Sequence, residues 1–176
     1  MVPVRDPRLQ RLTELVEPNQ TIPAMLRVVD IAGLVKGASQ GEGLGNQFLS
    51  HIRQVDAIAH VVRCFADENV VHVDGSPDPI RDIEVIQTEL ILSDLEQVER
   101  KLERLRKKAK GNREAAAAIP VFEKMLAHLG DGKLARSGDW SAEELVTFAE
   151  LSLITSKPSL YIANVSEEGL SEASEF

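Results

Sequence analysis

Asp30 and Gly33 form the part of this sequence whose residue types and spacing could do the most chemistry. Asp30 ends the apolar run 26–30, which we interpret as a strand, and open α/β sheets place ligands at the carboxyl ends of their strands. A carboxylate there can hold a hydrated Mg²⁺ ion, usually through water. Gly33 leaves room for its backbone N–H to approach a terminal phosphate. The pair predicts a magnesium and phosphate site, although Asp-x-x-Gly also occurs by chance.

Glycines continue from this pair at regular intervals. They recur at every fourth position, with one more between the last two, at Gly33, Gly37, Gly41, Gly43 and Gly45. Glycine loses the most backbone entropy on ordering, so we expect a loop that becomes ordered when ligand binds. The competing interpretation is a surface connection without a function.

Three further features have both a functional and a structural interpretation. Asn164 at the end of an apolar run could contact a base, or could simply end the strand in a turn. His72 is a lone histidine in an apolar context, which is typical of a structural side chain. A basic segment could contact ribosomal RNA, or could be a solvated helix face; its members are Arg100, Lys101, Arg104, Arg106, Lys107, Lys108 and Lys110.

The elements that position these residues indicate an α/β protein. Three short apolar runs, 26–30, 58–65 and 160–164, are typical of parallel strands that are covered on both faces. Between the first two, apolar residues at helical spacing in 45–55 predict a helix. Strand, glycine-rich loop, helix and strand in this order form a βαβ unit.

The middle of the chain predicts two helices. Residues 83–110 contain no proline or glycine, and apolar side chains follow a coiled-coil seam at Ile91, Leu95, Val98, Leu102 and Leu105. Gly111 and Asn112 should end this helix, and a second follows to about Leu129. We therefore expect an antiparallel helical hairpin inserted into the α/β domain. Ser141 and Glu144 predict a capping box that opens another helix, through Leu153.

Composition restricts the possible partners. The chain has 176 residues, 43% hydrophobic and 27% charged, with a net charge of −8 and one cysteine, Cys64. The net charge argues against a whole-surface nucleic-acid binder, and no sequence-specific DNA partner is expected. No apolar run approaches the roughly 20 residues of a membrane span, and the N-terminus lacks a signal-peptide pattern. These observations favour a cytoplasmic protein without a membrane partner.

The glycine-rich segment resembles the switch II region of Obg-family GTPases, and is most similar to the Obg-like ATPase, or YchF-type, branch. The resemblance continues through nearly the whole chain, and its specific segments are 30–39, 41–49, 60–65, 71–73, 78–79, 82–84 and 157–167. It implies a P-loop NTPase G domain that hydrolyses ATP, or GTP as the alternative, with Mg²⁺ as cofactor. It also implies a ribosome-linked role through the large subunit, the small subunit or both.

The resemblance also implies residue roles. Asp30 would hold Mg²⁺ through water and Gly33 would sense the γ-phosphate. Leu34 stands where Ras-like GTPases carry a water-orienting glutamine, and leucine cannot make a hydrogen bond, so water must be positioned by other means. His72 matches a histidine proposed as catalytic in the family. The base-recognition motif would be Asn164-Val165-Ser-Glu167, in a form that favours adenine over guanine.

Several family elements are absent from these 176 residues: the phosphate-binding loop, the switch I threonine region, the final G motif and the C-terminal TGS domain. We therefore expect an internal piece that binds nucleotide weakly or not at all alone, and whose sheet edges favour association. An alternative is a non-enzymatic interaction module that works through the hairpin. The expected division is 1–80, part of the G domain; 81–136, the inserted coiled-coil hairpin; and 137–176, the remaining G domain.

Overall fold

A computed structural model describes residues 1–31, 44–67 and 76–170 of the chain, and for residues 44–47 and 168 it describes the backbone alone. The chain divides into two compact units, Met1–Ala32 and Gly33–Phe176. Several predicted site residues lie outside the described residues: Gly33, Leu34, Gly37, Gly41, Gly43 and His72.

The first unit contains β1 (Val2–Pro3), α1 (Pro7–Val16) and β2 (Met25–Leu26). The two short strands pair antiparallel. Asp6 caps α1 by accepting a hydrogen bond from the backbone N–H of Arg8, and Pro7 occupies the first turn, where its missing N–H costs nothing. The helix ends at Val16, and the capping residue that follows, Glu17, has a left-handed φ of 47°. No residue of the described part of this unit, 1–31, is buried.

The predicted strand at 26–30 is wrong in extent, direction and burial. Only Met25–Leu26 forms a strand, and its partner β1 runs antiparallel to it. Val28 and Val29 are exposed, and residues 27–31 are in no strand. Apolar β-branched residues favour a strand, but a strand also needs a hydrogen-bonded neighbour, and 27–31 have none among the described residues.

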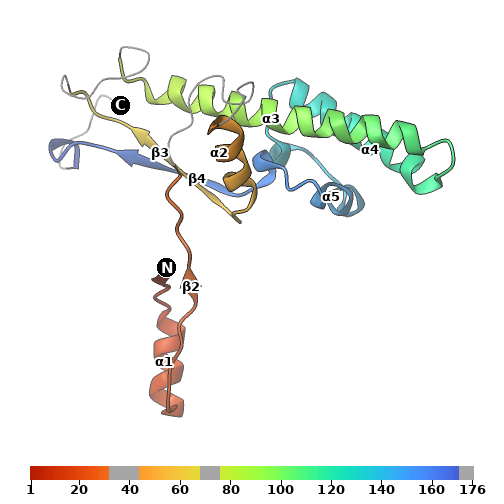
Figure 1. Ribbon diagram of the computed structural model, residues 1–176. Helices are drawn as coiled ribbons and strands as arrows, with labels where there is room; N and C mark the ends of the chain where they lie inside the picture. Colours follow the sequence, from red (N-terminus) through yellow and green to blue (C-terminus); the bar gives the residue numbers. More distant parts are fainter. Residues whose placement is uncertain (32–43, 68–75, 171–176) are drawn as a thin grey trace. The chain divides into compact units, whose positions relative to one another are not determined.

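The second unit holds a pair of parallel strands, β3 (Ile58–Arg63) and β4 (Ser159–Asn164), in a register that aligns Ile58 with Ser159 and Arg63 with Asn164. Figure 1 shows both strands ending at the same side. The predicted strands at 58–65 and 160–164 are thus confirmed within two residues. The expectation that these strands are covered on both faces is wrong, because Val61, Leu160 and Ile162 are 59%, 54% and 44% exposed. Strand side chains stand above and below a sheet, so these exposures mean that the described elements leave part of the faces of this pair uncovered.

Helix α2 (Leu44–Arg53) precedes β3 and confirms the helix predicted at 45–55. A much longer helix, α3 (Pro79–Lys108), follows β3, contacts it, and continues to a contact with α4 (Arg113–Gly130) (Figure 1). Asp78 caps α3, and Asn112 caps α4 by accepting from the backbone N–H of Ala115. Asn112 therefore begins the second helix instead of only ending the first.

The hydrophobic core lies between α3 and α4. The predicted seam on α3 is confirmed by burial: Ile91, Val98, Leu102 and Leu105 are buried, and Leu95 packs against them. The side chains that α4 contributes to this core are Ala115, Phe122, Met125 and Leu129. The two helices run in opposite directions and are joined by a short turn (Figure 1).

Short elements close the far side of this core. They are η1 (Ala135–Ser137), α5 (Ala142–Ala149) and η2 (Ile154–Ser156), and β4 is followed by η3 (Glu168–Leu170). The capping box is confirmed: the Glu144 carboxylate accepts the backbone N–H of Ser141 at 2.7 Å, and the Ser141 hydroxyl accepts the backbone N–H of Glu144 at 3.2 Å. The predicted continuation of α5 to Leu153 is wrong, because Ser152 adopts a left-handed φ of 47°. None of the helices in the described ranges is long and apolar enough to cross a membrane.

Candidate nucleotide site at the carboxyl edge of the parallel strands

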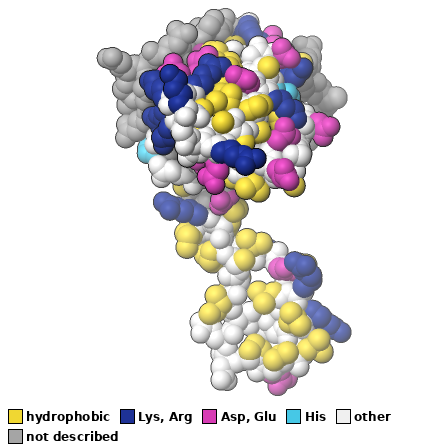
Figure 2. All heavy atoms as spheres, turned by 90° about the vertical axis from the view of Figure 1, so that its right-hand side faces the viewer, with side chains coloured by type: hydrophobic (Ala, Val, Ile, Leu, Met, Phe, Trp, Pro, Cys, Tyr) yellow, Lys and Arg dark blue, Asp and Glu magenta, His cyan; other side chains and the backbone are white. Residues whose placement is uncertain are grey.

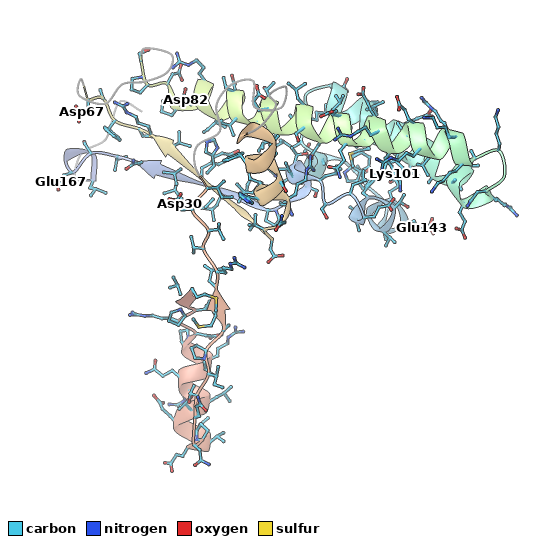
Figure 3. The ribbon with its side chains drawn as sticks, in the orientation of Figure 1. Asp30, Asp67, Asp82, Lys101, Glu143 and Glu167 are labelled. Carbon is cyan, nitrogen blue, oxygen red and sulfur yellow. The ribbon has the colours of Figure 1, made fainter. Side chains whose placement is uncertain are left out.

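Asn164 lies at the carboxyl end of β4, directly beside the end of β3. Its carbonyl accepts the backbone N–H of Cys64 at 2.8 Å, so the two strands remain joined to their last residues. The Asn164 side chain is exposed, Val165 is partly buried and Glu167 is exposed. In Figure 3, Glu167 and Asp67 lie beyond this same edge, which is where parallel sheets present groups to ligands.

Arg63, which sequence analysis missed, shapes the exit of β3 next to Asn164. Its Nε donates to the carbonyl of Phe65 at 3.0 Å, and its Nη2 donates to that of Asp67 at 3.2 Å. The guanidinium also lies 4.7 Å from the centre of the Phe65 ring. A cation in this place holds the chain that leaves β3. No local pattern signals this role, because an arginine at a strand end is most often simply solvated.

The phosphate side of the predicted site is described only in part. Asp30 is exposed near the end of the first unit, and Gly45 lies in α2. Among the described residues, no group of three or more His, Cys, Asp or Glu could hold a metal ion. Mg²⁺ commonly takes one or two carboxylates together with substrate phosphates and water. The single carboxylate of Asp30 fits that type of site and does not fit an all-protein metal cage.

Asp94 anchors the helix that follows the glycine-rich segment. Its carboxylate is fully buried and forms an ion pair with Arg53 at the end of α2, 3.1 Å from Nη1. It also accepts the backbone N–H groups of Ile154 and Thr155 at 2.9 and 2.7 Å, and the Thr155 hydroxyl at 2.8 Å. One side chain of α3 therefore holds both α2 and the start of η2.

A second contact connects α2 with the beginning of β4. The Lys157 ammonium donates to the carbonyl of Val55 at 2.6 Å, and Ile58 N–H donates to the carbonyl of Pro158. Arg53 adds a hydrogen bond of 2.8 Å to the Ser93 hydroxyl. These bonds fix the end of α2 against the segment that leads to Asn164. The end of α2 and the beginning of β4 are thus joined directly by hydrogen bonds.

His60 lies between the parallel strands and α3. Its ring centre is 5.7 Å from that of Tyr161, whose hydroxyl accepts a 2.6 Å hydrogen bond from Gln87 on α3. Burial lowers the pKa of His60, and the charge of Asp82 opposes that effect. The environment therefore favours the neutral imidazole. These contacts belong to the packing of α3 on the sheet and lie away from the carboxyl edge.

The fold and this edge define the class of protein: an α/β domain of the G-domain type, with parallel strands and helices. The chain belongs to the family described as 50S ribosome-binding GTPase, whose model matches residues 5–124. It is also homologous along nearly its whole length to proteins named YchF.

Two curated relatives show the extent of this similarity. The ribosome-binding ATPase YchF of Escherichia coli O157:H7 is 54% identical over 170 residues, which cover 96% of this chain and 47% of the relative. The Bacillus subtilis (strain 168) protein of the same name is 51% identical over 175 residues, 99% of this chain and 48% of the relative. The chain thus spans about half the length of these relatives.

A solved structure confirms the fold. The structure described as the Schizosaccharomyces pombe YchF GTPase matches with a TM-score of 0.81 and 44% identity. The match covers 96% of this chain and 47% of the other. The bacterial relatives are named ATPases and the yeast structure a GTPase, so the names of these proteins differ on the nucleotide.

Proposed function

We propose that the chain contributes the base-recognition and switch II parts of a Mg²⁺-dependent nucleoside-triphosphate hydrolase of the YchF type. One observation carries the proposal: the parallel pairing of β3 with β4 presents Asn164 at the carboxyl edge of the sheet. In this proposal the Asn164 amide contacts the base, with Val165 beside it and Glu167 as a weaker contact. Family membership supports the assignment.

The phosphate side of the proposed site comes from the glycine-rich segment. Asp30 would hold the Mg²⁺ of the nucleotide through water, and Gly33 would sense the γ-phosphate. His72 is the proposed catalytic residue, and Leu34 leaves the orientation of the attacking water to other groups. The remaining glycines of the proposed switch II are Gly37, Gly41, Gly43 and Gly45.

ATP is the proposed nucleotide, with GTP as the alternative. A GTPase uses an aspartate at the last motif position to accept hydrogen bonds from guanine, whereas this chain has Glu167 there. Adenine offers a 6-amino donor and an N1 acceptor, which the Asn164 amide can match in both directions. The names of the bacterial relatives agree with this preference.

Isothermal titration with Mg-ATP and Mg-GTP tests the proposal on two polypeptides: residues 1–176, and a polypeptide extended to the length of the relatives. We expect weak or no binding by the first, and ATP binding tighter than GTP binding by the second. Asn164→Ala in the extended polypeptide should weaken ATP binding by roughly 10-fold, the value of about one hydrogen bond to a base. Absence of ATP affinity in the extended polypeptide would refute the proposal.

The domain division remains part of the same proposal. Residues 1–80 and 137–176 would form the G domain, and 81–136 would be an inserted coiled-coil hairpin. The support is the buried seam between α3 and α4 and the short turn at Asn112. We also propose a cytoplasmic location, because the relatives are named ribosome-binding.

A second candidate function is an interaction module that binds the ribosome through the hairpin, with or without hydrolysis. The observation that favours it is the exposed basic segment at the end of α3. The two candidates are compatible, because the turn between α3 and α4 and the carboxyl edge lie at opposite ends of the second unit (Figure 1).

A further inference from the structure

The turn between α3 and α4 carries a dense positive charge in an acidic chain. Residues 104–113 contain six cationic side chains and no carboxylate, whereas the whole chain has a net charge of −8. Figure 2 looks onto this end of the second unit and shows Lys and Arg side chains gathered on one side of the face. Where charge so concentrated is not compensated within the protein, it raises the local positive potential and attracts anionic partners.

Part of the basic segment is compensated within the fold. Arg100 pairs with Glu96 at 2.6 Å, Lys101 with Glu150 at 2.6 Å, and Arg106 with Glu123 at 2.7 Å. The Lys101 ammonium also lies over the Phe122 ring, 5.9 Å from its centre. Lys101 and Arg106 thus connect α3 with the end of α5 and with α4, whereas the Arg100 pair lies within α3, and all three cations already have a carboxylate partner.

The other cations, which we call the tip cluster, make no ion pair with any described residue and are exposed; they are Arg104, Lys107, Lys108, Lys110 and Arg113. Lys107 and Lys110 line a shallow open hollow together with Arg106 and Glu103. The lysines of the last turn interact favourably with the helix dipole of α3, which stabilises the helix by about 0.3–1 kcal/mol for each charge. This effect does not account for Lys110 or Arg113, which lie beyond the end of the helix.

The chemistry of the tip favours a polyanion over a protein surface. Protein interfaces centre on buried aromatic or aliphatic anchors. Within residues 104–113 the sole large apolar side chain is Leu105, which is buried in the core. A phosphate backbone needs no such anchor, because released counterions drive its association with clustered Lys and Arg.

We propose that the tip cluster binds the phosphate backbone of RNA without sequence preference, and that the three paired cations take no part in it. The inference rests on the proposed ribosome binding and specifies its contact. Five phosphate contacts give a slope of log affinity against log salt of about −3.5 to −4.5. Affinity should therefore fall by about 100- to 500-fold between 50 and 200 mM salt.

Fluorescence anisotropy with a labelled RNA stem–loop, measured at several salt concentrations, tests this contact. The tip variant carries Lys107→Gln, Lys108→Gln and Lys110→Gln. A matched control with the same loss of charge carries Arg8→Gln, Arg11→Gln and Lys133→Gln, all exposed positions elsewhere. The tip variant should reduce the magnitude of the salt slope by about 2 to 3 while the control leaves it within about 0.5. Circular dichroism should show the same melting temperature for both.

An equal effect of the two triple variants, or no RNA binding by the unaltered chain, would overturn the proposal. Co-sedimentation with purified ribosomes separates it from the proposed function. Loss of sedimentation in the tip variant together with loss of RNA binding supports both. Equal sedimentation of the tip variant and the unaltered chain would show that the tip cluster is not the contact with the ribosome. It would overturn this proposal and leave the proposed ribosome binding intact. Loss of sedimentation with unchanged RNA affinity would assign the tip to an acidic protein and overturn the RNA contact.

Discussion

Asp94, which sequence analysis did not select, connects α3 with both α2 and η2. Its carboxylate receives the Arg53 guanidinium, two backbone N–H groups of η2 and the Thr155 hydroxyl, and it is fully buried. A buried carboxylate with all its hydrogen bonds made is tolerated, whereas donors left without an acceptor are costly. The residue could have been noticed, because an acidic side chain three positions after Ile91 lies on the apolar side of α3.

Replacing Asp94 with alanine should reduce the free energy of unfolding by about 3 kcal/mol, because the buried donors lose their acceptor. Urea denaturation followed by circular dichroism measures this loss. Arg53→Met is the matched comparison and should cost less, since Arg53 is partly exposed and Asp94 keeps its other three donors. Equal costs for the two variants would show that the ion pair, and not the bonds to η2, dominates.

His60 gives the stability of the second unit a dependence on pH. Burial lowers its pKa in the folded state below the ordinary value of 6.5. As the pH falls below 6.5, the unfolded chain takes up a proton that the folded chain resists, and stability is lost until the pH passes the folded pKa. Above 6.5 the full contribution is present.

We therefore expect the melting temperature of the unaltered chain to fall faster than that of His60→Gln between about pH 7.5 and about pH 5.5. The difference between the two proteins isolates His60 from the other titrating groups. Parallel curves across this range would contradict the assigned effect of burial.

At the scale of elements, Trp140 shows how a loop closes the core. Its Nε1 donates to the carbonyl of Ala135 at 2.6 Å, and its ring contacts those of His128 and Phe148 edge-on. The Lys124 ammonium lies 4.9 Å from the ring centre. Gly138 makes this arrangement possible, because a Cβ there would stand 2.3 Å from the indole.

Gly138→Ala should displace the indole and destabilise the chain by roughly 1–3 kcal/mol, the usual cost of overpacking. Trp140 is the single tryptophan of the sequence, so its fluorescence emission reports the displacement directly. Gly130→Ala serves as the control, since a Cβ there meets nothing within 4 Å and improves helix propensity. An unchanged emission spectrum in Gly138→Ala would contradict the expected clash.

The elements with strong periodicity were predictable from the sequence. The α3 seam, the α2 helix and the Ser141 capping box follow from local patterns, since their signals lie within one or two helical turns. Asp94, Arg63 and the Gly138–Trp140 contact were not predictable, because each depends on how the fold arranges its neighbours in space. The prediction of a strand at 26–30 was wrong for the same reason. Its apolar, β-branched pattern is typical of a strand, but whether a segment forms one depends on the neighbouring strand that the fold places beside it.

At the scale of the whole molecule, apolar side chains of the parallel pair remain uncovered. Val61, Leu160 and Ile162 are all exposed, on strands that each have an unpaired edge within the described ranges. Such strands favour edge-to-edge association. We expect residues 1–176 to self-associate at micromolar concentrations, as sedimentation velocity would show.

Charged side chains on this pair should weaken that association. Val61→Lys with Ile162→Lys is expected to shift the population toward monomer, whereas the tip variant should leave it unchanged because its substitutions lie at the other end of the unit. Self-association that is unaffected by the two strand substitutions would place the contact elsewhere.

The register of the two parallel strands also has a consequence for the order of folding. Ile58 pairs with Ser159, about 100 positions later, while the contacts between α3 and α4 join residues on either side of one short turn. Closing the longer loop costs more chain entropy, and non-local pairing is slow. We therefore expect the helical hairpin to form early and to bring the two strands close to each other. The edge that presents Asn164 should then be among the last parts of the molecule to assemble. A chain emerging from synthesis would accordingly display the basic tip before the edge proposed to bind nucleotide has assembled.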